Sequence, residues 1–147
     1  MAETRQGLAL TYDGAAKVLA AAARKAVEIG APQCIAVTDE GGHLLAFGRT
    51  DGGKVLSIDS SIAKARTAAS SRVPTGRMTD ELARGLAFAT GGKATNLPGG
   101  LPIVVDGHLI GAIGVGSGTG EQDIEVAAAG IAALAGAKDW TNGREEV

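Results

Sequence analysis

The sequence predicts an α+β domain in which helices pack on an antiparallel sheet made of two hairpins. Two observations carry this prediction: two pairs of short apolar segments are each joined by a tight turn, and helical periodicity fills the chain around them. Hairpin connections join antiparallel strands, whereas parallel strands need a long crossover. With 147 residues, the chain suits one domain. We expect a single domain over residues 1–147, with its core at about 8–136 and a short flexible tail at 141–147.

The elements are expected in the order α-β-β-α-α-β-β-α. The first helix begins at Thr11, where apolar residues start to recur at helical spacing, and Gly30 ends it. The turn at 39–42, Asp-Glu-Gly-Gly, joins the first hairpin, and Pro-Thr-Gly at 74–76 separates the second helix from the third. The expected ranges, in order, are 11–29, 34–38, 44–47, 57–71, 79–89, 103–105, 109–115 and 121–135.

The second hairpin lies in a glycine-rich stretch, Leu97–Asp123. Its two β-branched segments flank Asp106-Gly107, a dipeptide typical of tight hairpin turns. Thr119 and Gln122 form a capping-box pattern that begins the last helix. Backbone without side chains beside a helix N-terminus allows a ligand or another chain to approach closely.

Composition and charge narrow the function classes. The net charge is −2 at pH 7 and the cations are scattered, so a nucleic-acid surface is not expected. A single cysteine excludes an internal disulfide framework. No stretch reaches the ~18 apolar residues of a membrane span, and residues 1–14 lack the pattern of a secretory signal. We expect a cytoplasmic protein that binds neither nucleic acid nor membrane.

The glycines do not fit a nucleotide site. Those at 114–120 alternate as GxGxGxG instead of GxGxxG, and the strand before them belongs to a hairpin instead of a β-α-β unit. Glu121 and Asp123 follow directly, where a phosphate needs neutral or positive surroundings. A zinc site is not expected either, because the one cysteine and two histidines lie in separate elements.

The cysteine and the histidines have plain structural interpretations. Cys34 lies within an apolar strand, which favours a core residue over a nucleophile. His43 and His108 each follow a tight turn, where a solvent-facing side chain is the simpler interpretation.

Five charged residues are candidates for a site: Arg49, Asp51, Lys64, Glu121 and Asp123. If Arg49 and Lys64 face one cleft, they form a carboxylate-binding pair. The alternatives are simple, since the helix dipole alone accounts for Glu121 and Asp123, and Lys64 can be a surface lysine.

Six short motifs in this order resemble one known family: D-x-G-G-H-L, R-x-D-G, K-A-x-T-A, P-G-G-x-P, G-A-I-G-V and E-Q-D. The chain resembles the GlcG/HbpS-like family over about residues 8–136. That family includes GlcG-type proteins of glycolate utilisation, extracellular haem-binding HbpS-type proteins and the C-terminal domain of PduO-type corrinoid adenosyltransferases. The resemblance implies a compact α+β fold and a homo-oligomer, whether dimer, tetramer or octamer.

The resemblance leaves function open, because members bind haem, bind a corrinoid or belong to catabolic operons. Haem is the most specific ligand that the resemblance implies, although the first helix here carries no histidine that could bind the iron. An axial ligand would have to come from His43, His108, Met78 or Tyr12, with His43 as the first candidate.

The leading hypothesis is an oligomer that binds a small carboxylated or oxygenated metabolite of a catabolic pathway. No cofactor is expected in this case, and an enzyme of this kind would carry out isomerisation, hydration or elimination as a lyase, isomerase or hydrolase. The acid/base candidates are Lys64, Glu121 and Asp123, and the ligand-binding candidates are Arg49, Asp51, Pro98, Gly99, Gly100 and Gly116. The alternative is a haem- or corrinoid-binding sensor or carrier, and in a third interpretation the glycines serve only subunit packing.

Overall fold

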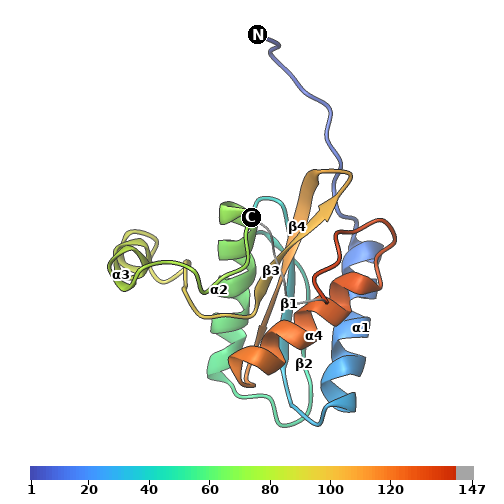
Figure 1. The fold of residues 1–147 in the computed structure, drawn as a ribbon, viewed down its shortest axis with the longest axis vertical. Helices are drawn as coiled ribbons and strands as arrows, with labels where there is room; N and C mark the ends of the chain where they lie inside the picture. Colours follow the sequence, from blue (N-terminus) through green and yellow to red (C-terminus); the bar gives the residue numbers. More distant parts are fainter. Residues whose placement is uncertain (142–147) are drawn as a thin grey trace.

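The computed structural model describes residues 1–141 and forms a sheet between two layers of helices (Figure 1). The elements are α1 (Tyr12–Glu28), β1 (Cys34–Asp39), β2 (Leu44–Arg49), α2 (Leu56–Ser71), α3 (Asp80–Ala89), β3 (Gly100–Val105), β4 (His108–Gly116) and α4 (Gly120–Ala132). The strand order is β2-β1-β4-β3 with every neighbouring pair antiparallel, so the expected α+β class and element order are confirmed. Among the described residues, no helix is long and apolar enough to cross a lipid bilayer.

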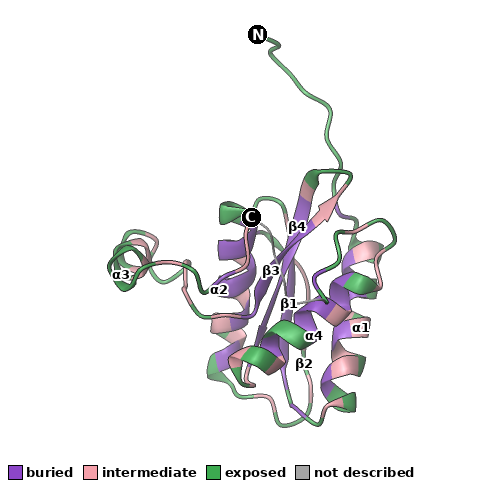
Figure 2. Cartoon of the chain, in the orientation of Figure 1, coloured by how far each residue is buried: buried purple, intermediate pink, exposed green. Residues whose placement is uncertain are grey.

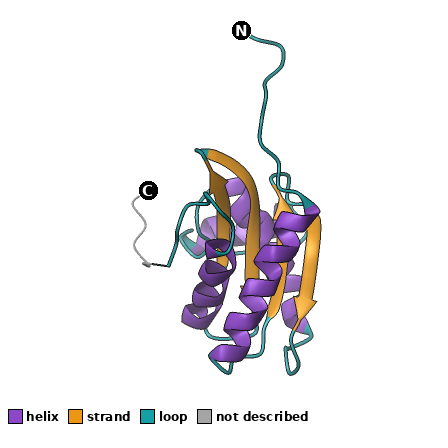
Figure 3. Ribbon diagram, turned by 90° about the vertical axis from the view of Figure 1, so that its right-hand side faces the viewer, coloured by secondary structure: helices purple, strands orange, loops and turns teal. Residues whose placement is uncertain are grey.

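Large aliphatic side chains fill the space between the sheet and the layer formed by α1 and α4, the face toward the viewer in Figure 3. On α1, the residues Ala15, Val18, Ala22 and Ala26 recur every three or four positions and form its buried stripe. Burial of this apolar surface is the main favourable contribution to folding, and Figure 2 shows it concentrated along the strands and the inner sides of the helices.

The opposite face of the sheet carries α2, and here small residues set the packing distance. Ala68 and Ala69 of α2 pack against Ala112 of β4. A Cβ atom added to Gly114 would lie 2.5 Å from the backbone nitrogen of Ala65, so any larger residue would push α2 away. The backbones of α2 and β4 therefore lie in near contact.

The chain after α4 returns to the free edge of β3. The last helix ends at Ala132, three positions earlier than the sequence suggests, because the chain then turns back to the sheet. The N–H of Lys138 donates to the carbonyl of Val104 at 2.8 Å, and the Trp140 indole donates to the carbonyl of Pro102 at 3.0 Å. These bonds cover an edge that would otherwise expose unpaired backbone groups. Of the tail expected to be flexible at 141–147, residues 142–147 lie outside the described part of the chain.

The helix α3 stands away from the rest of the molecule (Figure 1). Its N-terminus is capped by Thr79, whose side chain accepts from the N–H of Leu82, yet none of its residues is buried. Phe88 on this helix is 89% exposed. A helix of ten residues is marginal in water on its own, so α3 depends on the segments that tie it to the body.

Candidate functional site

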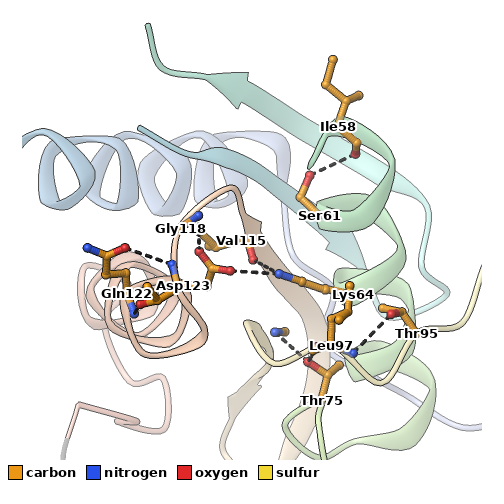
Figure 4. A network of polar contacts seen from close by, with 12 residues as sticks. Ile58, Ser61, Lys64, Thr75, Thr95, Leu97, Val115, Gly118, Gln122 and Asp123 are labelled. Carbon is orange, nitrogen blue, oxygen red and sulfur yellow. Dashed lines mark hydrogen bonds and ion pairs between the residues drawn. The ribbon is translucent and has the colours of Figure 1, made fainter. Parts of the chain in front are cut away.

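A buried ion pair joins helices from opposite faces of the sheet (Figure 4). The Lys64 ammonium on α2 donates to the Asp123 carboxylate on α4 at 3.0 Å and to the carbonyl of Val115 at 2.7 Å. The other Asp123 oxygen accepts from the N–H of Gly118 at 3.0 Å. Both side chains are at most 5% exposed, so their charges are neutralised by each other and by these backbone groups. Two of the predicted catalytic residues therefore lie in direct contact.

Three of the predicted ligand-binding glycines surround this pair. A Cβ atom on Gly99, whose φ is +117°, would lie 2.9 Å from the Cβ of Asp123 and 3.2 Å from the Lys64 nitrogen. One on Gly116 would lie 3.6 Å from the same nitrogen, and one on Gly100 would meet the backbone of Lys64. In this structure the glycines make room for the ion pair itself. Pro98 lies close by and packs against Gly120 at the start of α4.

Gln33 is a further member of this cluster, and no pattern in the sequence indicated it. It is fully buried directly before β1, and neither the oxygen nor the nitrogen of its amide has a hydrogen-bond partner within residues 1–141. A Cβ atom on Gly118 would lie 2.6 Å from the Gln33 amide nitrogen and 2.9 Å from an Asp123 oxygen, so the amide and the carboxylate face the same turn. A polar residue beside an apolar strand is common, and only the three-dimensional structure distinguishes this one.

The remaining predicted site residues lie elsewhere. Glu121 is exposed on the outer side of α4, where it lines a depression together with Lys25 and Trp140. Arg49 is exposed at the end of the edge strand β2, and Asp51 lies in the loop that follows. The structure does not pair Arg49 with Lys64, because the Lys64 ammonium is buried against Asp123 and Val115.

Cys34 lies in the sheet between the two flanking strands and is fully buried. Burial raises the pKa of its thiol, and the nearby positive charge of Arg49 lowers it by less. Because the thiolate is the reactive form, Cys34 is suited to packing, as the sequence indicates.

A second region, beside the C-terminal half of α2, is an open groove of about 420 Å³. Its walls are the turn between β1 and β2, the C-terminal half of α2, and α3 with the segments that flank it. We call it the His43 groove; the residues that matter here are His43, Arg66, Met78, Leu86, Lys93 and Ala94. It combines an imidazole, a thioether, two cations and apolar side chains.

The His43 ring is held in place by Asp39. Its Nδ1 lies 3.2 and 3.3 Å from the two carboxylate oxygens, and its side chain is 82% exposed. The carboxylate also accepts from the N–H groups of Gly41 and His43, at 2.9 Å each. Burial raises the pKa of Asp39, but these N–H groups and the imidazole together lower it by more than burial raises it. The pKa of Asp39 therefore lies below its usual value. Among the described residues, the second ring nitrogen, Nε2, has no hydrogen-bond partner.

The other candidate iron ligands are distributed unevenly. Met78 lines the His43 groove, whereas His108 lies exposed at the turn between β3 and β4, and Tyr12 is 67% exposed at the start of α1. Neither of the latter two lines this groove.

Comparisons with known proteins agree with this fold. Residues 10–132 match a family model described as "Haem degrading protein HbpS-like". The chain is 39% identical to the 15.0 kDa protein of the dhaT-dhaS intergenic region of Citrobacter freundii, over 84% of this chain and 90% of that protein. It is 42% identical to protein GlcG of Escherichia coli K12, over 72% of this chain and 80% of GlcG.

Two solved structures are also similar. The Klebsiella pneumoniae protein ORFY superimposes with a TM-score of 0.85 at 32% identity, covering 91% of this chain and 96% of that chain. A PduOC:haem complex superimposes with a TM-score of 0.81 at 26% identity, covering 89% and 98%.

Proposed function

Because the chain belongs to the HbpS-like family, we propose that it binds haem in the His43 groove. The observation that carries the proposal is the His43 imidazole, which Asp39 holds at the edge of this groove and whose Nε2 has no partner in the described part of the chain. A relative of the same fold has been solved as a haem complex, which supports haem as the first ligand to test.

The arrangement of His43 and Asp39 suits a metal ligand. A histidine that binds a metal through one nitrogen usually donates its other ring N–H to a carboxylate or carbonyl, which fixes the tautomer and the ring orientation. Asp39 meets that requirement through Nδ1, at 3.2 Å. His43 would therefore hold the haem iron through Nε2, as histidine does in many haem proteins.

The rest of the groove suits the porphyrin. Leu86 and Ala94 offer apolar contact to a macrocycle, and Arg66 and Lys93 offer positive charge to its two propionates. The Arg66 Nε donates to the carbonyl of Gly42 at 3.3 Å, which holds this side chain against the turn that carries His43. A volume of about 420 Å³ lies within the range of small-molecule sites.

Bound haem would supply one-electron and oxygen chemistry, while the chain's own residues hold and orient it. The residues that do so are His43, fixed by Asp39, and the cations of the groove. A corrinoid is the alternative tetrapyrrole, since imidazole can also ligate cobalt, and the experiment below includes it as a separate arm.

Hemin titration of the purified protein tests the proposal. Wild type should bind one equivalent of hemin with a shifted Soret band, and His43→Ala should lose this band while keeping its denaturation midpoint. His108→Ala is the matched control, because His108 is also exposed but lies outside the groove. Equal hemin binding by wild type and His43→Ala contradicts the proposal. Binding of hydroxocobalamin but not hemin would assign the groove to a corrinoid instead.

A second candidate function is acid/base chemistry on a small carboxylated or oxygenated metabolite at the Lys64–Asp123 pair. It is supported by the convergence of Lys64 and Asp123 with the unpartnered amide of Gln33. In this case, hydroxy- and keto-acids should raise the melting temperature of wild type but not of Asp123→Asn. The absence of any shift across such a panel removes this candidate.

We also propose a homo-oligomer. The exposed Phe88 and Leu82 on α3 would gain burial from a neighbouring subunit. Light scattering measures the mass directly, and a monomer at micromolar concentration would contradict this part of the proposal.

A further inference from the structure

We propose that the Met78 thioether would be a second protein ligand, beside His43, for haem bound in this groove, and that Asn96 positions Met78. This inference depends on the proposed haem site. It starts from the placement of Met78, which lines the same groove as His43 although the two belong to different loops. Imidazole and thioether form a known pair of axial haem ligands.

Met78 is not needed by the hydrophobic core. It is only half-buried, and it belongs to neither cluster of buried apolar side chains among the described residues. A methionine in a core gap would be surrounded by aliphatic side chains, whereas this one shares its surroundings with His43, Arg66 and Lys93. The groove is open and is lined by polar and apolar groups together, so the thioether is available for a metal.

The backbone of Met78 is fixed by the side chain of one residue. The N–H of Met78 donates to the Asn96 amide oxygen at 2.9 Å, and the Asn96 amide nitrogen donates to the carbonyl of Met78 at 2.9 Å. A carboxamide that bonds both sides of one residue restricts both its position and its orientation. Asn96 is therefore a positioning residue, acting on the ligand only through Met78.

The base of the α3 segment is anchored to the body in the same region. The Thr75 hydroxyl donates to the carbonyl of Leu97 at 2.6 Å and accepts from the N–H of Gly100 at 2.9 Å. The N–H of Thr95 donates to the Thr67 hydroxyl on α2 at 3.0 Å. Met78 consequently lies on the anchored base of α3, although the helix itself stands away from the sheet (Figure 1). These bonds hold the backbone near Met78 in place before a ligand binds, whereas a side chain at the far end of α3 would lack such support.

Other groups of the groove are less suited to the second position. The hydroxyl of Thr67, for example, already donates to the carbonyl of Ala63 at 2.7 Å. Met78 is the one thioether that lines the groove within the described chain.

The test compares hemin complexes of wild type, Met78→Leu and Met78→His by three readouts. Wild type should be six-coordinate and low-spin in its electron paramagnetic resonance spectrum, and it should bind added imidazole poorly. Met78→Leu keeps the shape of the side chain, so it should still bind one hemin but become high-spin, bind imidazole readily and show a lower reduction potential. Met78→His should stay low-spin with a lower potential than wild type.

Asn96→Ala examines the positioning role. This variant loses the two hydrogen bonds to the Met78 backbone but keeps the thioether, so a mixture of high-spin and low-spin haem should appear. Hemin affinity should fall about 10–100-fold, as for other residues that orient a metal ligand. Asn96→Asp keeps the acceptor for the Met78 N–H and should be less affected.

The outcomes separate the two proposals. If Met78→Leu keeps the low-spin spectrum and the potential of wild type, Met78 is not the ligand, while the loss of hemin from His43→Ala still supports the haem site. If wild type binds no hemin, both proposals fail. Should Met78→Leu fold poorly, the Met78→His complex decides, because an unchanged potential in that variant contradicts methionine ligation in wild type.

Discussion

Lys64 and Arg66 lie two positions apart on α2, yet their surroundings are opposite. The Lys64 ammonium is sealed between α2 and α4 and bonded to Asp123 and Val115, whereas Arg66 is half-buried on the wall of an open groove. The first region has charges that neutralise each other inside the protein. The second has the thioether of Met78, the cations Arg66 and Lys93, and an imidazole that contacts the partly exposed Asp39 carboxylate. The Lys64–Asp123 pair joins helices from the two faces of the sheet, whereas the His43 groove is the place where we propose that the ligand binds.

The largest loss of stability is expected when one partner of the buried Lys64–Asp123 pair is removed and the other remains. Lys64→Met leaves the Asp123 carboxylate buried without its cation, which should cost about 3–5 kcal/mol of unfolding free energy. Urea denaturation measures it, with Lys54→Met as a matched control because Lys54 is exposed. The double variant Lys64→Met/Asp123→Leu should recover most of the loss, since apolar residues can replace a buried ion pair. A loss below about 1 kcal/mol in the single variant would show that the pair does not hold the layers.

The next largest loss of stability is expected where α2 packs closely on the sheet. Gly114→Ala places a methyl group against the backbone of α2 and should destabilise by about 1–3 kcal/mol through overpacking. Gly85→Ala on α3 is the matched control, because a Cβ atom there meets nothing within 4 Å and alanine favours a helix by up to ~1 kcal/mol. Equal effects of the two substitutions on thermal unfolding would contradict the difference between these regions.

A smaller effect, confined to the groove, is expected from Asp39. Asp39→Asn weakens the support of the His43 ring and should lower hemin affinity about 10–100-fold. The unfolding free energy should change by no more than about 1 kcal/mol, because the lost bonds lie at an exposed turn. Hemin titration and urea denaturation of the same preparation separate the two effects, and an unchanged hemin affinity would show that Asp39 does not support His43 as a ligand.

The smallest effect is a pH dependence of stability. The pKa of the Asp39 carboxyl is lower in the folded protein than in the unfolded chain, so its stabilising contribution is present above the unfolded value of about 4 and is lost as the pH falls through the folded value. Wild type should therefore exceed Asp39→Asn in stability at pH 7, by less than about 1 kcal/mol, and the difference should vanish in acid. A difference that grows toward low pH would have the wrong sign.

Local signals in the sequence predicted most of the fold. The capping-box pattern of Thr119 and Gln122 marked the start of α4. In the structure, each of these side chains accepts a hydrogen bond from the backbone N–H of the other residue. The turn of Asp106-Gly107 marked the second hairpin, and both of its residues have positive φ. Such features depend on residues that are close in sequence, so a pattern can reveal them.

The site was predictable only in part, because it depends on contacts between distant segments. Lys64 and Asp123 were both named as candidates, but nothing local indicates that residues 59 positions apart form a pair. Glu121 has the same helix-start context as Asp123, yet it faces outward, which depends on the rotation of α4 against the sheet. The His43 groove brings together the β1–β2 turn, α2 and the base of α3, a set that no spacing rule identifies.

The most direct test of this account is the dissociation constant of hemin measured side by side for Lys64→Met/Asp123→Leu and for His43→Ala. The double variant should bind hemin as tightly as wild type, and His43→Ala, although as stable as wild type, should bind it at least 10-fold more weakly, as expected when a metal site loses a key group. Loss of hemin binding in the folded double variant, together with its retention in His43→Ala, would contradict the account and move the ligand to the Lys64–Asp123 region.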